Sequence, residues 1–298
     1  MKGKLVVAGS LMRFGKSVVW TGLTLLFLHL TATAAFSQAG FIKILNFPGS
    51  TFTAPEDINN RGEIVGVYND INDVNQGFLY CNGTFTSYSV PDATSTQIRG
   101  INNHGDFVGT YVDSQNQNHG FLLDHSGQVT TLDFYGVNQT LPNGINDQGT
   151  ITGLYIDNNQ VAHYFVYANG QAVQIDVPNA TIPSDFSSWP KINNSGSLVG
   201  TVVDNDSQQR RAVLVSNGVT MTFGVNGDSG TGARAINSAG AITGPNSGPG
   251  YVLANGKITI FQVPGISGTQ PRGINDKRQV TGIYSDANGT HGFIMQMP

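Results

Sequence analysis

Three arginines share one repeated position in this sequence, and arginine is the side chain best suited to bind anions through paired hydrogen bonds. Arg99, Arg234 and Arg272 each stand two residues before an isoleucine that asparagine follows. A guanidinium fork fits a carboxylate or a phosphate. Two other copies carry Glu56 and Asn143 at this position. We predict that these five residues bind a ligand; the alternative is that each arginine bonds carbonyls or acids of neighbouring units.

A second set of residues has the composition of an acid–base site. His119, His163 and His291 share one repeated position just before an apolar segment. A second repeated position, four residues after a glycine, carries Asp70, Asp113, Asp157, Asp204 and Asp286. A His beside an Asp can transfer protons, but Asp side chains in hairpins more commonly bond nearby backbone. Because these residues recur from unit to unit, we interpret them as structural and assign no catalytic residue.

Metal chemistry has little support in the sequence. Asp70-Ile71-Asn72-Asp73 and Asp204-Asn205-Asp206 offer oxygens at alternate positions, as hard cations prefer. Neither segment continues to the glutamate that completes an EF-hand loop. The single cysteine, Cys81, excludes a disulfide framework and a cysteine-based zinc site. We expect no metal and no cofactor, with calcium as a minor alternative.

The composition restricts the class of protein. Only 11% of the 298 residues are charged, the net charge is −4 and there are 38 glycines, whereas a typical soluble domain is about 25% charged. No block of Lys and Arg provides the electrostatic footprint of a nucleic-acid-binding protein. These features favour a neutral, β-rich globular protein.

The first 34 residues have the parts of a secretory signal peptide. Basic residues up to Lys16 precede an apolar segment, residues 18–30, and then the small residues Ala32 and Ala34. The apolar segment is shorter than the about 20 residues of a membrane span. We expect cleavage after Ala34, and export to the periplasm or the extracellular space. Residues 35–298 then form one domain without a membrane span.

The rest of the chain is a repeat of six units. The repeated isoleucines lie 43, 44, 47, 44 and 38 residues apart, and about 40–45 residues is the length of a four-stranded propeller blade. They are Ile58, Ile101, Ile145, Ile192, Ile236 and Ile274. The Asn-x-Gly that follows predicts a tight turn, since Asn and Gly both tolerate positive φ. Asn-Gly pairs such as Asn82-Gly83 predict a further two-residue hairpin in most units.

The ends of the chain complement each other. The last unit stops after a third strand at residues 293–295, and residues 41–48 have the pattern of a fourth strand. We therefore predict an all-β, six-bladed β-propeller with four strands per blade, in which the N-terminal strand completes the last blade. Such closure removes free edges. A linear β-solenoid is the alternative, but it would need capping units at both ends.

These residues resemble a known family. The pattern G-I-N-x-x-G-x-[VI]-[VT]-G, followed by [HQ]-[GA]-F, is similar to the bacterial extracellular HAF repeat. The clearest matches are residues 100–109 with His119-Gly120-Phe121, and residues 273–282 with His291-Gly292-Phe293. The fourth unit departs from the pattern with Arg210-Arg211-Ala212-Val213. The resemblance implies a propeller-like fold and no assigned activity.

Two functions remain open on the sequence. The first is a secreted, non-enzymatic binding module for an extracellular polymer or protein, an anionic glycan being one such ligand. The second is a carbohydrate- or ester-active enzyme, a hydrolase or lyase, with its site at the mouth of the central channel. In either case we expect the arginine position to begin the innermost strand of each blade, close to that mouth.

Overall fold

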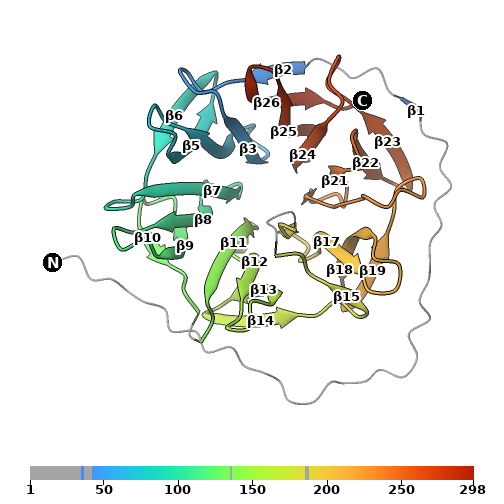
Figure 1. Ribbon diagram of the computed structural model, residues 1–298, viewed down its shortest axis with the longest axis horizontal. Coiled ribbons are helices and arrows are strands. Elements are labelled where there is room, and N and C mark those ends of the chain that lie inside the picture. The colour runs from blue at the N-terminus through green and yellow to red at the C-terminus, as the bar shows by residue number, and fades with distance from the viewer. Residues whose placement is uncertain (1–34, 37–41, 135, 185–187) are drawn as a thin grey trace.

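The computed structural model describes residues 35–36, 42–134, 136–184 and 188–298, and the expected signal peptide lies outside them. Six antiparallel sheets stand around a central axis like the blades of a propeller (Figure 1). No helix occurs in the described part of the chain. The predicted six-bladed fold is therefore confirmed.

Each of the first three blades is built from consecutive strands, with the first strand at the axis. The first blade consists of β3 (Thr53–Ile58), β4 (Ile64–Asn69), β5 (Asn75–Cys81) and β6 (Thr84–Tyr88). The second consists of β7 (Ser95–Ile101), β8 (Phe107–Val112), β9 (Asn118–Leu123) and β10 (Val129–Thr131). The third consists of β11 (Gln139–Ile145), β12 (Ile151–Ile156), β13 (Ala162–Ala168) and β14 (Gln171–Ile175).

The fourth and fifth blades have shortened inner strands. The fourth blade consists of β15 (Ala180–Thr181), β16 (Lys191–Ile192), β17 (Leu198–Asp204), β18 (Arg210–Ser216) and β19 (Val219–Phe223). The fifth consists of β20 (Ala235–Ile236), β21 (Ile242–Pro245), β22 (Gly250–Ala254) and β23 (Lys257–Phe261), and β1 (Ala35–Phe36) pairs parallel with β23. In the fourth blade both β15 and β16 pair with β17.

The sixth blade closes the ring. It contains β24 (Thr269–Ile274), β25 (Gln279–Asp286) and β26 (Gly289–Gln296), and its outer strand is β2 (Ile42–Leu45) from the other end of the chain. Ile42 pairs with Met295 and Leu45 pairs with Gly292. The predicted closure by the N-terminal strand is confirmed.

A β-bulge interrupts the inner strand of four blades. The pairing of β3 with β4 shifts between Pro55 and Asp57, so Glu56 is the extra residue, and β7, β11 and β24 shift in the same place. The residues inserted there are Arg99, Asn143 and Arg272. A bulge redirects the side chain of its extra residue. The expectation that this position begins the inner strand is wrong, because Arg99 is the fifth of seven residues in β7.

The last glycine of the repeat pattern makes room for this bulge. Gly109 pairs with Ile98, next to the bulge at Arg99. A Cβ atom on Gly109 would lie 2.0 Å from the carbonyl oxygen of Gln97, and one on Gly282 would lie 2.1 Å from that of Gln270. Real Cβ contacts essentially never come that close. Glycine is therefore required opposite the bulge.

The asparagine that follows each repeated isoleucine belongs to a closed ring of hydrogen bonds, which we call the asparagine ring. Each side-chain amide donates to the main-chain carbonyl of the equivalent asparagine in the next blade, over 3.0–3.2 Å. The members are Asn59, Asn102, Asn146, Asn193, Asn237 and Asn275. In each blade the side-chain oxygen also accepts N–H groups of its own turn, as Asn193 does from Ser195 and Ser197.

The turn interpretation of the Asn-x-Gly segments was only half right. The positive φ belongs to glycine in five units, for example 85° at Gly62, and to Arg278 in the sixth, at 59°. None of the ring asparagines has a positive φ. Their role is to join neighbouring blades through the hydrogen bonds described above. The Asn-Gly hairpins behave as predicted, since Asn82 and Gly83 both have positive φ.

Candidate functional site

The arginine position lines the central channel, where the three arginines converge. Arg99 Nη1 lies 2.6 Å from Glu56 Oε1, and Arg272 contacts the same oxygen from the sixth blade. Burial alone would raise the pKa of Glu56, but Arg272 and Arg99 hold it below its ordinary value. Glu56 is therefore an ionised counter-ion shared by two arginines.

Arg234 is different, because no carboxylate pairs with its side chain within the described residues. Desolvation, with the positive charges of Arg272 and Arg99, lowers the pKa of Arg234 to about 9. The guanidinium remains cationic at neutral pH, but its charge is poorly compensated. The positive charge of the three arginines therefore exceeds the negative charge beside them, and a bound anion could balance it.

The arginines also have unused hydrogen-bond donors. The Nε atoms of Arg99, Arg234 and Arg272 are buried and have no hydrogen-bond partner in the part of the chain that the structure describes. A buried polar atom without a partner costs about 1–3 kcal/mol. Three such donors at one level of the channel are an arrangement that a bound carboxylate or phosphate could satisfy.

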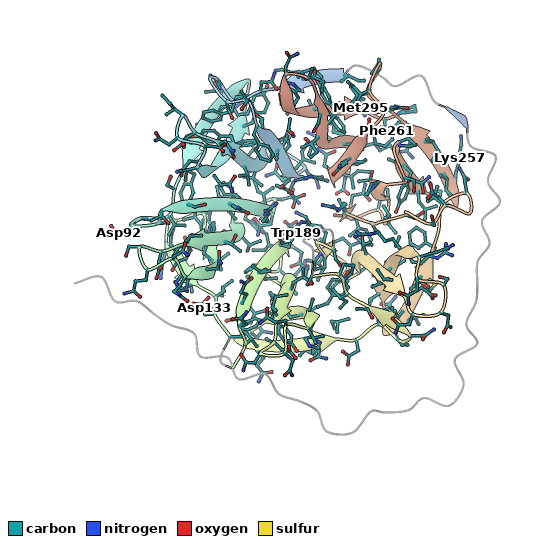
Figure 2. The ribbon with its side chains drawn as sticks, in the orientation of Figure 1. Asp92, Asp133, Trp189, Lys257, Phe261 and Met295 are labelled. Carbon is teal, nitrogen blue, oxygen red and sulfur yellow. The ribbon has the colours of Figure 1, made fainter. Side chains whose placement is uncertain are left out.

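Trp189 lies beside this group at the centre of the ring (Figure 2). The guanidinium carbon of Arg99 lies 4.4 Å from the centre of the Trp189 ring, a cation–π contact. Arg99 also donates to the side chain of Gln97. These contacts hold Arg99 in place.

Asn143 does not join the arginines. Its side-chain nitrogen donates to the carbonyl of Pro190 over 3.2 Å, so it connects the third and fourth blades. Of the five residues predicted from the sequence, the structure brings together Glu56, Arg99, Arg234 and Arg272. The alternative, in which an arginine bonds an acid of a neighbouring blade, holds for Arg99 and Arg272 through Glu56, and Asn143 joins blades through a carbonyl.

The sequence reading missed a charged pair that crosses the channel. Lys191 Nζ lies 2.9 Å from Asp57 Oδ2, and also donates to the carbonyl of Arg99. Asp57 accepts main-chain N–H groups from Ile58 and Ile101 as well. Burial raises the pKa of Asp57, while Lys191 and these donors oppose the rise. This pair separates the arginines from the asparagine ring.

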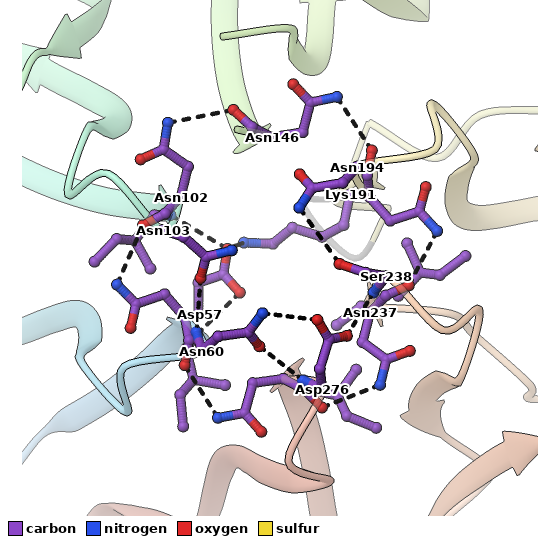
Figure 3. Close-up of a pocket in the computed structure, with 18 of the residues that line it drawn as sticks. Asp57, Asn60, Asn102, Asn103, Asn146, Lys191, Asn194, Asn237, Ser238 and Asp276 are labelled. Carbon is purple, nitrogen blue, oxygen red and sulfur yellow. Dashed lines mark hydrogen bonds and ion pairs between the residues drawn. The ribbon is translucent and has the colours of Figure 1, made fainter. Parts of the chain in front are cut away.

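Beyond the pair lies a small polar pocket, shown in Figure 3. Its volume is about 60 Å³, and Asp57, Lys191 and the asparagine ring are among the residues that line it. A single water needs about 10–15 Å³ of space open to it, so the pocket has room for a few waters. None of the three arginines lines this pocket; they belong to the opposite side of the charged pair.

The repeated histidines and aspartates lie away from the channel axis, around the turns between second and third strands. Asp113 Oδ1 accepts N–H groups from Gln115 and Gln117 within its own turn, and its other oxygen lies 3.2 Å from His119 Nε2. His163 and His291 contact their own turn aspartates in the same way. The geometry agrees with the structural interpretation of these positions.

The segments considered for calcium are turns of the same kind. Asp70 Oδ1 accepts N–H groups from Asn72 and Val74, and Asp204 Oδ1 accepts that of Ser207. Within the described ranges no group of three or more His, Cys, Asp or Glu side chains could hold a metal ion. The same residues include no helix long and apolar enough to cross a bilayer.

Comparisons with known proteins support the fold. No protein-family model and no curated protein matches the sequence. Among solved structures, a lectin from Aleuria aurantia bound to Fucα1-6GlcNAc has a TM-score of 0.52 and 12% identity, over 81% of this chain and 92% of the lectin. A gluconolactonase from Xanthomonas campestris has a TM-score of 0.50 and 11% identity, over 90% of this chain and 98% of that one. At such identities the likeness shows the fold alone, which lectins and enzymes share.

Proposed function

We propose that this protein is a binding propeller whose channel receives an anionic group of an extracellular ligand. The observation that carries the proposal is the group formed by Arg99, Arg234 and Arg272, in which, among the described residues, the three buried Nε atoms have no hydrogen-bond partner and Arg234 has no paired carboxylate. A carboxylate, sulfate or phosphate would supply the missing charge and acceptors. The lectin likeness is compatible with a glycan as the carrier of that group.

Binding explains the residues of the channel better than glycoside hydrolysis does. Glycoside hydrolysis needs two carboxyl groups, commonly one to give a proton and one to act as base or nucleophile. The two channel carboxylates, Glu56 and Asp57, both lie in ion pairs with cations. Glu56 is thereby held in its ionised form. These residues order the cations that surround them, which is a role in positioning.

We also propose, from the sequence, that the protein is exported and belongs with the HAF-repeat proteins. Export with cleavage near Ala34 makes a ligand outside the cytoplasm accessible. Mass spectrometry of protein recovered outside the cytoplasm checks this directly. A product that retains the residues before Ala32 would contradict it.

The binding proposal is tested by replacing Arg234 with glutamine. Calorimetric titration uses an oligosaccharide that ends in one uronate, with its neutral counterpart as a second ligand. We expect Arg234→Gln to weaken binding of the uronate ligand at least tenfold, since a charged hydrogen bond contributes about 1.5–3 kcal/mol. Arg99 is a poorer target because its removal also leaves Glu56 short of a partner.

The matched control is Arg61→Gln, which removes the same charge from an exposed arginine. Arg61 lies at the end of the channel that carries the asparagine ring, where it pairs with Glu63. It should bind the ligand as the parent does. Equal affinity for the neutral and the uronate oligosaccharide, or binding unaffected by Arg234→Gln, would refute the proposal.

A further inference from the structure

The two faces of the propeller differ in charge. Adjacent strands of a blade are antiparallel, so turns after the first and third strands lie at the mouth with the asparagine ring. Turns after the second strand, and the linkers between blades, lie at the other face. Arg99 extends toward that face, because it contacts Gln97, two residues earlier on β7, and Trp189, which lies just before the inner strand β16 of the fourth blade. We call this face the arginine face.

The turns and linkers of the arginine face form an acidic rim. Among the described residues, these turns and linkers, with the strand residues that border them, hold eleven aspartates, and the cations beside them include Arg210, Arg211 and Arg234. The aspartates are Asp70, Asp73, Asp92, Asp113, Asp133, Asp157, Asp176, Asp204, Asp206, Asp228 and Asp286. Hydrogen bonds from turn N–H groups lower the pKa of several, including Asp113 and Asp157. The rim is therefore negatively charged well below neutral pH.

The charged pair inside the channel forces a long ligand to leave on the side of this rim. Lys191 and Asp57 join opposite blades across the axis, and the pocket beyond them holds about 60 Å³. A polymer chain whose anionic group reaches the arginines cannot continue through the channel. Its remaining units must leave on the arginine face, the side of the molecule that carries the rim aspartates.

Resting on the proposed function, we infer that the site selects ligands with one terminal anionic group on an otherwise neutral body, and rejects polyanions. Only the first group of a polyanion meets the arginines, while each further charge passes the aspartates. Like charges placed together suppress wrong partners. Exposed charges interact over about 10 Å at 0.1 M salt and about 30 Å at 0.01 M, so the selection must weaken as salt rises.

The experiment compares two oligosaccharides of equal length by calorimetric titration at low and at physiological salt. One carries a single terminal uronate on neutral sugars, and the other is an oligogalacturonate with a charge on every unit. We expect the singly charged ligand to bind at least about tenfold more tightly at low salt. This ratio should fall toward one as the salt concentration rises.

Variants of the rim aspartates test whether these side chains cause the preference for the singly charged ligand. Asp92→Asn with Asp176→Asn removes two exposed charges from linkers of the arginine face, and should reduce the ratio at least about threefold. The control, Glu63→Gln with Asp124→Asn, removes two charges at turns of the opposite face and should leave the ratio unchanged.

The outcomes separate the two proposals. If the oligogalacturonate binds as tightly as the singly charged ligand or more tightly, or if the rim variant keeps the full ratio, the selection is refuted while the anion site stands. If neither ligand binds the parent protein, the proposed function itself is refuted, and the selection with it.

Discussion

Lys191 and Asp57 are 134 residues apart in the chain and come from opposite blades, yet Lys191 Nζ lies 2.9 Å from Asp57 Oδ2. Their side chains are 7% and 14% exposed. This buried pair joins the first and fourth blades across the channel. It also stops the channel between the arginines and the asparagine ring.

Replacing Lys191 with methionine should therefore destabilise the fold by about 3 kcal/mol, because it leaves Asp57 as a buried charge without its cation. Urea unfolding measures the loss. In this variant the pKa of Asp57, already raised by burial, should rise further. Asp57 then binds a proton more tightly in the folded state than in the unfolded state. The loss should then shrink as pH falls toward 4. Combining Lys191→Met with Asp57→Asn should restore part of the stability; a double variant weaker than the single one would contradict this account.

The asparagine ring predicts a large effect from a small substitution. Asn193→Ala removes the donor to Asn237 O and the acceptor of two turn N–H groups. We expect a loss of about 2–4 kcal/mol in the free energy of unfolding, since each buried group left unpaired costs about 1–3 kcal/mol. Asn158→Ala, at an exposed turn position, is the control and should change stability little. Similar unfolding midpoints for the two variants would show that the ring adds no stability.

The contacts of His119 predict that the stability of the fold depends on pH. Its two ring nitrogens face Asp133 and Asp113 at 2.6 and 3.2 Å. Partial burial would lower its pKa, but the hydrogen bonds to Asp133 and Asp113 raise it above 6.5. The imidazolium is thus favoured by folding. Its contribution is fully present below pH 6.5 and is lost as pH rises through the folded pKa.

The measurement is the denaturant midpoint at pH 5.5 and pH 8.5 for the parent and for His119→Gln. We expect the difference between parent and variant to be larger at the lower pH. His104→Gln, at an exposed turn, should preserve the parent's pH profile. A constant difference between parent and His119→Gln at both pH values would rule out the linkage.

The closure of the ring predicts the effect of an N-terminal truncation. Removing residues 42–47 takes away β2 and the ring of Phe47, which stacks on Tyr68 with 3.5 Å between ring centres. The outer edge of β26 is then unpaired, and such edges promote association between chains. We expect a lower unfolding midpoint and concentration-dependent oligomers in light scattering. A monomer with the parental midpoint would contradict closure by β2.

The fold could be predicted from the sequence because its determinants recur. Six units of similar length, Asn-Gly turns and complementary chain ends can all be recognised in the linear sequence, so the number of blades and the closure of the ring could be predicted. The bulges could not be predicted in this way. They arise from the pairing between two strands, and a shift between Pro55 and Asp57 leaves the repeat length unchanged.

The site was predicted in part for the same reason. The arginine position stood out because three units repeat it, whereas Lys191 occurs once and its partner lies three blades away. A signal for this pair was nevertheless present. The position before the repeated isoleucine is Gly or Ala in four units and charged in two, Asp57 and Lys191, with opposite signs and three units apart. In a ring of six, three units apart means face to face.

The asparagine ring has no first and no last member, since Asn275 donates to Asn59 as Asn59 donates to Asn102. The bonding that holds the blades together is therefore indifferent to where the polypeptide is cut. Ile42 and Met295 are paired neighbours in the sixth blade, so a short linker can join the two ends. A circularly permuted chain, opened at the exposed turn around Asn158, retains every bond of the ring and should reach the same fold.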